Sequence, residues 1–372
     1  MGKVKVLMVA DYPSPHLSGV FEALSAHPGL QMNFYFTKQR NPKRSWDSIL
    51  GKYPHEFLDL AQVNFQGRSL KIGISALRRI YKEDFDLIVI EDAYFQPFLL
   101  FLICCAWLKK RRWALYSEPP NRRQRGFLTR AYQKVVLKLF KNGTIFTHGR
   151  RGVEKFKAVA SAGCQVVNLP YFMDLHPYSL IPGVRKAVLP GAEINFLFCG
   201  QLIKRKRPDL LLNALTTLER YKWRLLLVGG GPEEKALREM VPSHLIDRVV
   251  FLGQVPLSEM PAYYALGDVF VYPSRDDGWG MAVPEALASG LPVISTYEVS
   301  SAVDLIKNGE NGFLIPADSE EALKGAILYF LEHPEAIPRF SQNASRVLER
   351  YNDSIISARF YEAVREFTQV RG

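Results

Sequence analysis

Short apolar runs alternate with segments of helical periodicity from one end of the chain to the other. Before residue 150 the apolar runs are KVKVLMVAD, QMNFYFT, DLIVIED, RWALYSE and GTIFTHG, and after residue 190 they are INFLFCG, WRLLLVGG, RVVFLG, VFVYPS and LPVIS. Continuous apolar strands followed by helical segments are typical of parallel sheets that are covered on both faces. The pattern predicts an α/β chain with two doubly wound sheets.

The chain has 372 residues, which is long enough for two domains. Proline and glycine are concentrated in residues 168–191, where the periodicity lapses, and this stretch marks the junction. We therefore expect a first Rossmann-like domain over residues 1–180 and a second over residues 181–350. A final helix within residues 351–372 is expected to pack back on the first domain.

The conspicuous turns of the sequence follow predicted strands. In the first half they are DYPSPHLSG, EDAYFQP, SEPPNRRQRG and THGRRG, and in the second half CGQLIKRKRPD, VGGGPEE, LGQVP and PSRDDGWGMAVPE. Ligands of doubly wound sheets bind at the carboxyl ends of the strands, where such turns gather. Two sheets whose strand ends face one another would enclose an interdomain cleft.

The stretch VYPSRDDGWGMAVPEALASGLPVIS carries the clearest candidate chemistry. A strand ends, Asp277 lies in the turn, and Gly278 and Gly280 allow the backbone to approach a ligand closely. A helix is expected to start near Met281, with Glu285 about one turn inside it and eight residues after Asp277. Both acids suit sugar hydroxyls. The alternative is a helix whose positive end is capped by acids.

This layout resembles the E-x7-E signature of the retaining glycosyltransferases of family 4, which have the GT-B fold of two facing Rossmann-like domains. Further segments agree with the family in order and spacing: FCGQLIKRKRPDLLLNAL, LLLVGGGPEEKALR, VVFLGQVPLSEMPAYYALGDVFVYPS and LIKNGENGFLIPADSEEAL. The resemblance covers residues 193–335 strongly and residues 1–180 only in outline. It implies an enzyme that transfers a sugar from a nucleotide donor.

The resemblance also implies roles for the residues of the signature. The first acid and the neighbouring backbone N–H groups hold the donor sugar, and the second acid binds the ribose of the nucleotide, here Glu285. The positions that match the first group are Asp277, Gly278, Trp279, Gly280 and Met281. Aspartate stands where the family has glutamate, and the loss of one methylene bears on the position or identity of the donor sugar.

The turn GQLIKRKRPD is similar to the family's diphosphate-binding turn. Lys206 matches its lysine, whereas Gln201 stands where arginine is usual. Enzymes of this fold need no metal, because cationic side chains and helix N-termini stabilise the leaving diphosphate. Lys206 would carry most of that task, helped by Lys204 or Arg205, while Arg207 is expected to face solvent. The alternatives are a solvated helix start or a nucleic-acid patch.

Two further turns match nucleotide-binding positions of the family. VGGGPEE resembles its Gly-x-Gly-Pro turn and supplies Gly229, although a tight turn into a helix explains the glycines equally well. FLGQVP matches the place where backbone groups bind the base, which makes Gln254 and Val255 candidates. Backbone contacts leave open whether the donor is a UDP-sugar or a GDP-sugar.

The first domain offers weaker candidates. Ser18 and Gly19, at an expected helix start, are placed to contact the donor or the acceptor. Glu118, after the strand RWALYSE, is a candidate acid/base group for the acceptor hydroxyl, or else a loop acid paired with Arg122 or Arg123. His16 and His148 are expected to be structural hydrogen bonders.

The net charge of +11 is unevenly distributed. Residues 1–180 hold 27 Lys+Arg against 13 Asp+Glu, whereas residues 181–372 hold 21 against 24. The apolar run 98–108 is too short to cross a bilayer, which takes about 20 residues. It is read as a buried helix, or as an interfacial anchor, because it precedes a basic, aromatic-rich segment suited to an anionic membrane surface. The charge also suits nucleic acid, but no recognition motif supports it.

The resemblance to this family implies a retaining, metal-independent hexosyltransferase. It would act on a sugar or lipid-linked acceptor in polysaccharide synthesis, in the cytoplasm or peripherally on the inner face of the membrane. No cofactor, metal or nucleic-acid partner is expected. The alternatives are a nucleotide-sugar epimerase or hydrolase of the same fold, and a non-catalytic sugar- or polyanion-binding relative.

Overall fold

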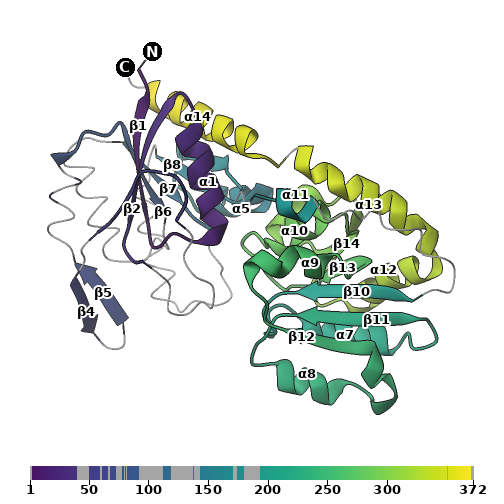
Figure 1. Cartoon of the computed structure of the whole chain (residues 1–372). Helices are drawn as coiled ribbons and strands as arrows, with labels where there is room; N and C mark the ends of the chain where they lie inside the picture. Colours follow the sequence, from purple (N-terminus) through teal and green to yellow (C-terminus); the bar gives the residue numbers. More distant parts are fainter. Residues whose placement is uncertain are drawn as a thin grey trace. The chain divides into compact units, whose positions relative to one another are not determined.

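The structure is a computed structural model in which the chain forms two compact units (Figure 1). One unit comprises Met1–Met173 with Asn352–Gly372, and the other comprises Asp174–Tyr351. The residues that it describes are 2–39, 50–58, 61–65, 68–72, 78, 80, 82–91, 112–118, 137, 143–170, 174–179, 193–349 and 351–369.

The first unit is built on a parallel sheet. Its order is β3-β2-β1-β6-β7-β8-β9, and every pairing is parallel. The central strands are buried along most of their length because apolar side chains point to both faces. The strands are β1 Val4–Ala10, β2 Leu30–Phe36, β3 His55–Phe57, β6 Leu87–Glu91, β7 Arg112–Tyr116, β8 Thr144–Thr147 and β9 Gln165–Asn168.

A small antiparallel pair and three longer helices complete the described part of this unit. The pair is β4 Ala61–Phe65 with β5 Arg68–Ile72, and the helices are α1 Pro15–Ala26, α5 Gly149–Lys157 and α14 Asp353–Gln369. The C-terminal helix α14 packs on α1 (Figure 1), and the rings of His27 and Tyr361 lie 4.5 Å apart. The chain therefore returns to its first unit at its end.

The second unit also has a parallel sheet, in the order β12-β11-β10-β13-β14-β15. Its strands are β10 Ile194–Cys199, β11 Trp223–Val228, β12 Val249–Gly253, β13 Val269–Tyr272, β14 Val293–Thr296 and β15 Gly312–Ile315. Its α-helices are α6 His176–Ser179, α7 Pro208–Thr216, α8 Glu234–Met240, α9 Met260–Tyr264, α10 Ala282–Ala288, α11 Ser300–Leu305, α12 Glu320–Glu332 and α13 Ile337–Ser345. Short 3-10 helices are η1 Ser243–Arg248, η2 Leu257–Glu259, η3 Pro334–Ala336 and η4 Arg346–Glu349.

The strand order of the second sheet places a topological switch point between β10 and β13. The chain runs outward from β10 through β11 to β12, then returns to the other side of β10 and continues through β13 to β15. Ligands of open α/β sheets bind in the crevice at such a point. The turns that follow β10 and β13 are those that the sequence marked for Lys206 and Asp277.

The two doubly wound parallel sheets predicted from the sequence are confirmed. One local expectation is wrong: α1 begins at Pro15 rather than near Gly19, because proline is favourable in the first turn and Ser14 stands before it in extended backbone. The apolar run 98–108 and the basic side chains between residues 119 and 141 lie outside the described residues. Among the helices that the structure does describe, none has the length and apolar character that a membrane span requires.

Candidate active site

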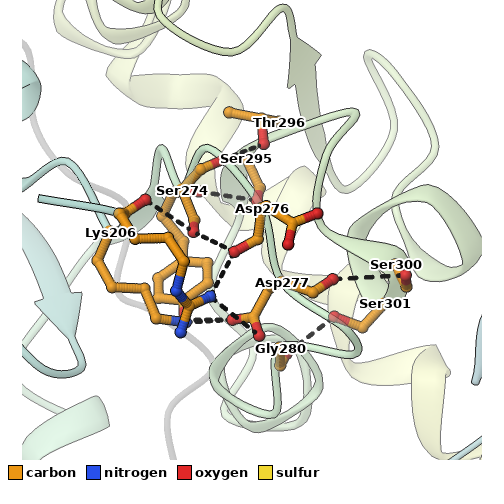
Figure 2. Close-up of polar contacts among 11 residues, drawn as sticks. Lys206, Ser274, Asp276, Asp277, Gly280, Ser295, Thr296, Ser300 and Ser301 are labelled. Carbon is orange, nitrogen blue, oxygen red and sulfur yellow. Dashed lines mark hydrogen bonds and ion pairs between the residues drawn. The ribbon is translucent and has the colours of Figure 1, made fainter. Parts of the chain in front are cut away.

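The turns after β10 and β13 bring Lys206 and Asp277 together. Figure 2 shows the Lys206 ammonium pointing at the Asp277 carboxylate, with which it forms an ion pair. The hydroxyl of Tyr272, the last residue of β13, donates to Oδ2 of Asp277 at 2.7 Å and also contacts the ammonium. Nζ of Lys206 lies 4.8 Å from the centre of the Tyr272 ring. The three side chains form one cluster.

A second cation faces the same carboxylate. Nη1 of Arg205 lies 3.6 Å from Oδ1 of Asp277 and donates to the carbonyl of Asp276. Burial alone would raise the pKa of Asp277, but the charges of Lys206 and Arg205 outweigh it and hold the pKa below its ordinary value. Asp277 is therefore a carboxylate at neutral pH.

The position of Lys206 depends on an unusual backbone conformation at Arg207. Arg207 has φ +56°, in the left-handed region that favours glycine, and it directly precedes α7. The Lys206 side chain turns inward and the residue is only 7% exposed. The expectation that Arg207 faces solvent is wrong: its side chain is 11% exposed and forms ion pairs with Asp209 and Asp318.

A set of buried hydroxyls fixes the loop that carries Asp277. They come from the end of β14 and the start of α11, and each donates to a backbone carbonyl in the segment 272–280 (Figure 2). The pairs are Ser295 with Tyr272 at 2.9 Å, Thr296 with Ser274 at 2.6 Å, Ser300 with Asp277 at 3.5 Å and Ser301 with Gly280 at 2.8 Å. The loop is thus held along its whole length by neighbouring backbone and side chains.

Packing explains one glycine of this loop, Gly280. Gly280 has φ +87°, and a Cβ at this position would lie 2.6 Å from Cγ1 of Val299. Close packing within the unit therefore requires Gly280, whatever a ligand requires. Within the described part of the chain, the N–H groups of Gly278, Trp279 and Gly280 donate to no backbone carbonyl. They are available to bind a ligand.

Trp279 and Met281 complete the segment. The Trp279 side chain is 2% exposed and stacks on Tyr351, with the ring centres 6.0 Å apart and the planes 12° apart. Its indole therefore belongs to the core, and only its backbone can reach a ligand. Met281 is the N-cap of α10, which begins one residue later, close to the expected start.

Glu285 lies in the first turn of α10 but differs from Asp277 in its surroundings. It is 5% exposed, and the Tyr264 hydroxyl donates to its Oε2 at 2.7 Å. Burial raises the pKa of Glu285 to about 7, against the opposing effect of hydrogen bonds from Tyr264 and Tyr178. The second acid of the motif therefore titrates near neutrality.

The remaining candidates of the second unit lie at the same edge of the sheet. Gln201 is exposed just after β10, and Gln254 is exposed after β12, beside a half-buried Val255. Gly229 directly follows β11 with φ +126°, and a Cβ there would lie 2.0 Å from the carbonyl oxygen of Gly200. The close approach of two turns therefore explains this glycine without a ligand.

The candidates of the first unit lie after the strands of its own sheet, with Glu118 and His148 following the paired strands β7 and β8. Glu118 is exposed two residues after β7, and Gly19 lies in the second turn of α1, beside a buried Ser18. His148 is buried, and its Nδ1 lies 3.2 Å from the carbonyl oxygen of Leu169. Burial lowers the pKa of His148 to about 3. His148 is thus a neutral structural residue, as the sequence indicated.

Sequence reasoning missed the tyrosines of the site. Tyr272 and Tyr264 place hydroxyls on the two acids of the motif, but in the sequence they look like ordinary core aromatics. The available signal was position: Tyr272 is the last residue of a strand and lies five residues before Asp277. A tyrosine at the carboxyl end of a buried strand can direct its hydroxyl into the ligand crevice.

The sequence is similar to those of known proteins. Residues 184–347 match the family model described as glycosyl transferases group 1. The chain is 26% identical over 262 residues to the lipopolysaccharide core biosynthesis mannosyltransferase LpcC of Rhizobium leguminosarum bv. viciae, covering 64% of this chain and 73% of the relative. It is 32% identical over 158 residues to a GDP-mannose-dependent alpha-(1-6)-phosphatidylinositol monomannoside mannosyltransferase of Mycobacterium tuberculosis, covering 40% of this chain and 41% of the relative.

Solved structures share the whole architecture. Anabaena HepE in complex with UDP and glucose superposes with a TM-score of 0.72 at 16% identity, covering 97% of this chain and 99% of the other. Apart from LpcC, the chain spans about half or less of the length of the curated relatives that it matches. These findings identify residues 184–347 as a glycosyltransferase domain within a chain of the GT-B fold.

Proposed function

We propose that this chain, whose second unit carries a group 1 glycosyltransferase domain, transfers a sugar from a nucleotide-sugar donor to an acceptor hydroxyl with retention of configuration. The observation that carries the proposal is the cluster of Lys206, Asp277 and Tyr272 at the carboxyl ends of β10 and β13, with Glu285 in the helix that follows. It combines a cation suited to a diphosphate with two carboxyl groups suited to sugar hydroxyls. We assign this chain to retaining glycosyltransferase family 4 on that basis.

Donor binding would exchange the partners of a buried ion pair. The Lys206 ammonium contacts Asp277 and Tyr272 in the structure. A diphosphate competes for the ammonium, while the donor sugar offers hydroxyls to Asp277 in return. Each group keeps a partner throughout, so neither is left as an unpaired buried charge, which would be strongly unfavourable.

The other proposed donor contacts surround this pair. The N–H groups of the 278–281 segment bind the donor sugar, Glu285 binds the ribose, and the turns at the ends of β11 and β12 bind the rest of the nucleotide. The residues of these groups are Gly278, Trp279, Gly280, Met281, Gln201, Gly229, Gln254 and Val255, with Gly19 from the first unit.

In the transfer step, the bond between the anomeric carbon and the diphosphate breaks as the acceptor oxygen bonds to the same face of that carbon. The sugar passes through an oxocarbenium-like state, and the nucleoside diphosphate leaves as an anion. Lys206 stabilises that anion electrostatically, so the proposal requires no metal ion. We assign Glu118 to orient the acceptor hydroxyl or accept its proton.

The names of the relatives support a choice of donor and acceptor. The LpcC relative is a lipopolysaccharide core mannosyltransferase, and the mycobacterial relative is GDP-mannose-dependent and acts on a phosphatidylinositol mannoside. We therefore propose mannose transfer from a GDP-mannose donor to a lipid-linked saccharide at the cytoplasmic face of a membrane.

A transfer assay tests the proposal. The chain is incubated with GDP-mannose or UDP-glucose carrying a labelled sugar, together with a bacterial glycolipid extract, and lipid-bound label is counted. We expect label from GDP-mannose in the lipid fraction. Label only as free sugar or as an epimerised nucleotide sugar would favour an epimerase or hydrolase, and nucleotide binding without turnover would favour a non-catalytic relative.

Two variants separate the roles of the acids. Asp277→Ala is expected to abolish transfer with little effect on GDP affinity, because it removes the donor-sugar contact. Glu285→Ala is expected to weaken GDP binding, because it removes the ribose contact. Full transfer activity in both variants would disprove the assignment of the site.

Membrane contact has its own test. Co-sedimentation with vesicles of phosphatidylcholine, with and without 30% phosphatidylglycerol, is measured at low and high salt. The basic excess of residues 1–180 predicts binding that requires the anionic lipid and weakens with salt, since exposed charges are screened. Binding that is indifferent to both would exclude an electrostatic membrane contact.

A further inference from the structure

Glu285 is held by two tyrosine hydroxyls from different elements. Tyr264, the last residue of α9, donates to Oε2 at 2.7 Å, and the hydroxyl of Tyr178, on α6, also favours the ionised carboxyl group and lowers its pKa. Both α6 and α9 pack against α10, which carries Glu285. The acid is therefore fixed by elements outside its own helix.

The two tyrosines are themselves rigidly packed. Tyr264 is fully buried and Tyr178 nearly so. Their rings meet edge to face, with the centres 5.5 Å apart and the planes 73° apart, and Tyr264 also packs on Phe270 of β13 at 5.6 Å. Such packing leaves each hydroxyl a single direction in which to point. The hydrogen bond from Tyr264 in turn holds the Glu285 carboxyl group in one orientation.

We infer that Tyr178 and Tyr264 are positioning residues that aim the Glu285 carboxyl group at the nucleotide. The inference rests on the proposed function, in which Glu285 binds the ribose. It adds two residues that hold this contact in place before the donor arrives. Preorganised groups of this kind spare the ligand the cost of ordering them.

Among the residues that the structure describes, no cation shifts the pKa of Glu285, so the tyrosine hydroxyls matter more. The titratable groups whose charge state is coupled to it are Tyr178, Tyr264, Tyr272 and Tyr351, together with the thiol of Cys199 at the end of β10. Burial raises the pKa of each tyrosine and of the thiol, so these groups are neutral at pH 7. Hydroxyl donors are thus the only described stabilisation of the Glu285 carboxylate, which burial otherwise disfavours.

Tyr178 lies at the start of the second unit, and this place in the chain bears on the orientation of Glu285. The second unit begins at Asp174, and α6, His176–Ser179, is its first helix. The residue that helps to aim Glu285 therefore lies on the segment by which the chain enters the unit. The orientation of Glu285 depends on how that segment is seated against α9 and α10.

Hydroxyl-deleting variants test the inference. GDP affinity is measured by calorimetry between pH 6 and pH 9 for the full chain and for Tyr264→Phe, Tyr178→Phe and the double variant. Each single variant is expected to bind GDP about tenfold more weakly at pH 7, the loss of one hydrogen bond to a charged group. The half-buried Tyr263, on the same helix, provides the control Tyr263→Phe, which should bind normally.

The pH dependence separates positioning from a general structural role. Hydrogen bonds to the carboxylate lower its pKa, so removing one should move the titration of Glu285, and the pH midpoint of GDP binding, to higher pH. Infrared titration of the protonated carboxyl band, assigned by its absence in Glu285→Gln, follows the same event without nucleotide.

The outcomes are distinguishable. Unchanged affinity and an unchanged carboxyl titration in the double variant would overturn the inference, as would a loss of affinity equal at every pH with the titration unmoved. The unaltered chain could bind neither GDP nor UDP while the carboxyl titration of Glu285 shifts in the variants as expected. The proposed function would then be wrong, and so would the claim that the tyrosines direct Glu285 toward a nucleotide. The interaction of the tyrosine hydroxyls with the Glu285 carboxyl group would still be demonstrated by that shift.

Discussion

Asp277 and Glu285 lie eight residues apart on one turn and helix, yet the protein gives them opposite properties. Asp277 faces Lys206 and Arg205 and accepts the hydroxyl of Tyr272. Glu285 accepts the hydroxyl of Tyr264, and no cation of the described residues shifts its pKa. Burial disfavours the charge on both acids, but the pKa falls at Asp277 and rises to about 7 at Glu285.

The difference shows that neighbouring cations, rather than burial, decide the charge of an acid in this site. Asp277 is ionised at neutral pH and holds the Lys206 ammonium in an ion pair. Glu285 is poised between two protonation states and depends on its hydrogen bonds to stay charged. The same motif thus contains one acid that is ionised at neutral pH, Asp277, and one whose protonation changes near pH 7, Glu285.

The largest expected effect comes from removing the cation on the Asp277 side. Lys206→Met leaves the Asp277 carboxylate without its main partner, and breaking one side of a buried ion pair costs about 3–5 kcal/mol. We expect the free energy of unfolding at pH 7, measured in urea, to fall by that amount. The exposed Lys204 on the same turn gives the control Lys204→Met, which should change it little.

A second substitution makes this prediction specific. Adding Asp277→Asn to Lys206→Met removes the carboxylate that has lost its main cation, so the double variant should recover much of the lost stability. If the two effects simply add, the Lys206 and Asp277 side chains are not coupled, and the comparison between the two acids loses its basis.

Periodicity located the framework of both sheets because their central strands are buried on two faces. The runs KVKVLMVAD and WRLLLVGG became β1 and β11. The strands that the pattern did not single out lie at sheet edges: β3, β9 and β15 end the parallel sheets, and β4 and β5 form a separate antiparallel pair. At an edge, one side of the strand lacks a neighbour, and the apolar pattern weakens accordingly.

The sequence predicted where the site residues lie along the chain, but not which of them contact one another. The sequence placed Lys206 and Asp277 on turns after two strands, but their pairing depends on β10 and β13 being neighbours in the sheet. The error at Arg207 has the same origin, since its partner Asp318 lies 111 residues away. Contacts of such long range are set by the fold and leave no local signal.

The second largest effect concerns the Glu285 side of the comparison. Its pKa is raised from 4.5 to about 7 by burial, so the folded state holds a proton that the unfolded state has lost between these pH values. Stability should therefore fall as pH rises from about 4.5 to about 7, by up to about 3 kcal/mol. Glu285→Gln cannot ionise and should lack this loss.

Urea unfolding at pH 5 and pH 8 measures this prediction. Relative to the unaltered chain, Glu285→Gln should gain stability on going from pH 5 to pH 8. The exposed Glu259 supplies a control, Glu259→Gln, whose effect should be equal at both pH values. A Glu285→Gln effect that is independent of pH would mean that Glu285 is no more protonated when folded than when unfolded.

A smaller effect is expected at the hydroxyl that Asp277 accepts. Tyr272→Phe removes the 2.7 Å hydrogen bond but keeps the ring, and should cost about 2 kcal/mol of unfolding free energy at pH 7, as for a bond to a charged group. The cost should diminish as pH falls through the lowered pKa of Asp277. Tyr297→Phe, at an exposed position, is the control, and a loss that persists unchanged in acid would point to packing instead.

The smallest effect addresses the loop between the two acids. The Ser301 hydroxyl donates to the Gly280 carbonyl at 2.8 Å and is fully buried, so Ser301→Ala should cost about 1 kcal/mol. Because the carbonyls held by Ser300 and Ser301 belong to the Asp277 turn, the proposed function predicts that sugar transfer falls more than GDP affinity, for which Glu285 is the proposed ribose contact. As a control, Ser345→Ala removes an exposed hydrogen bond of a serine hydroxyl within α13, and it should change neither sugar transfer nor GDP affinity. If Ser301→Ala weakened transfer and GDP affinity equally, the turn that carries Asp277 and the helix that carries Glu285 would respond as one unit. The properties of the two acids could then not be changed separately.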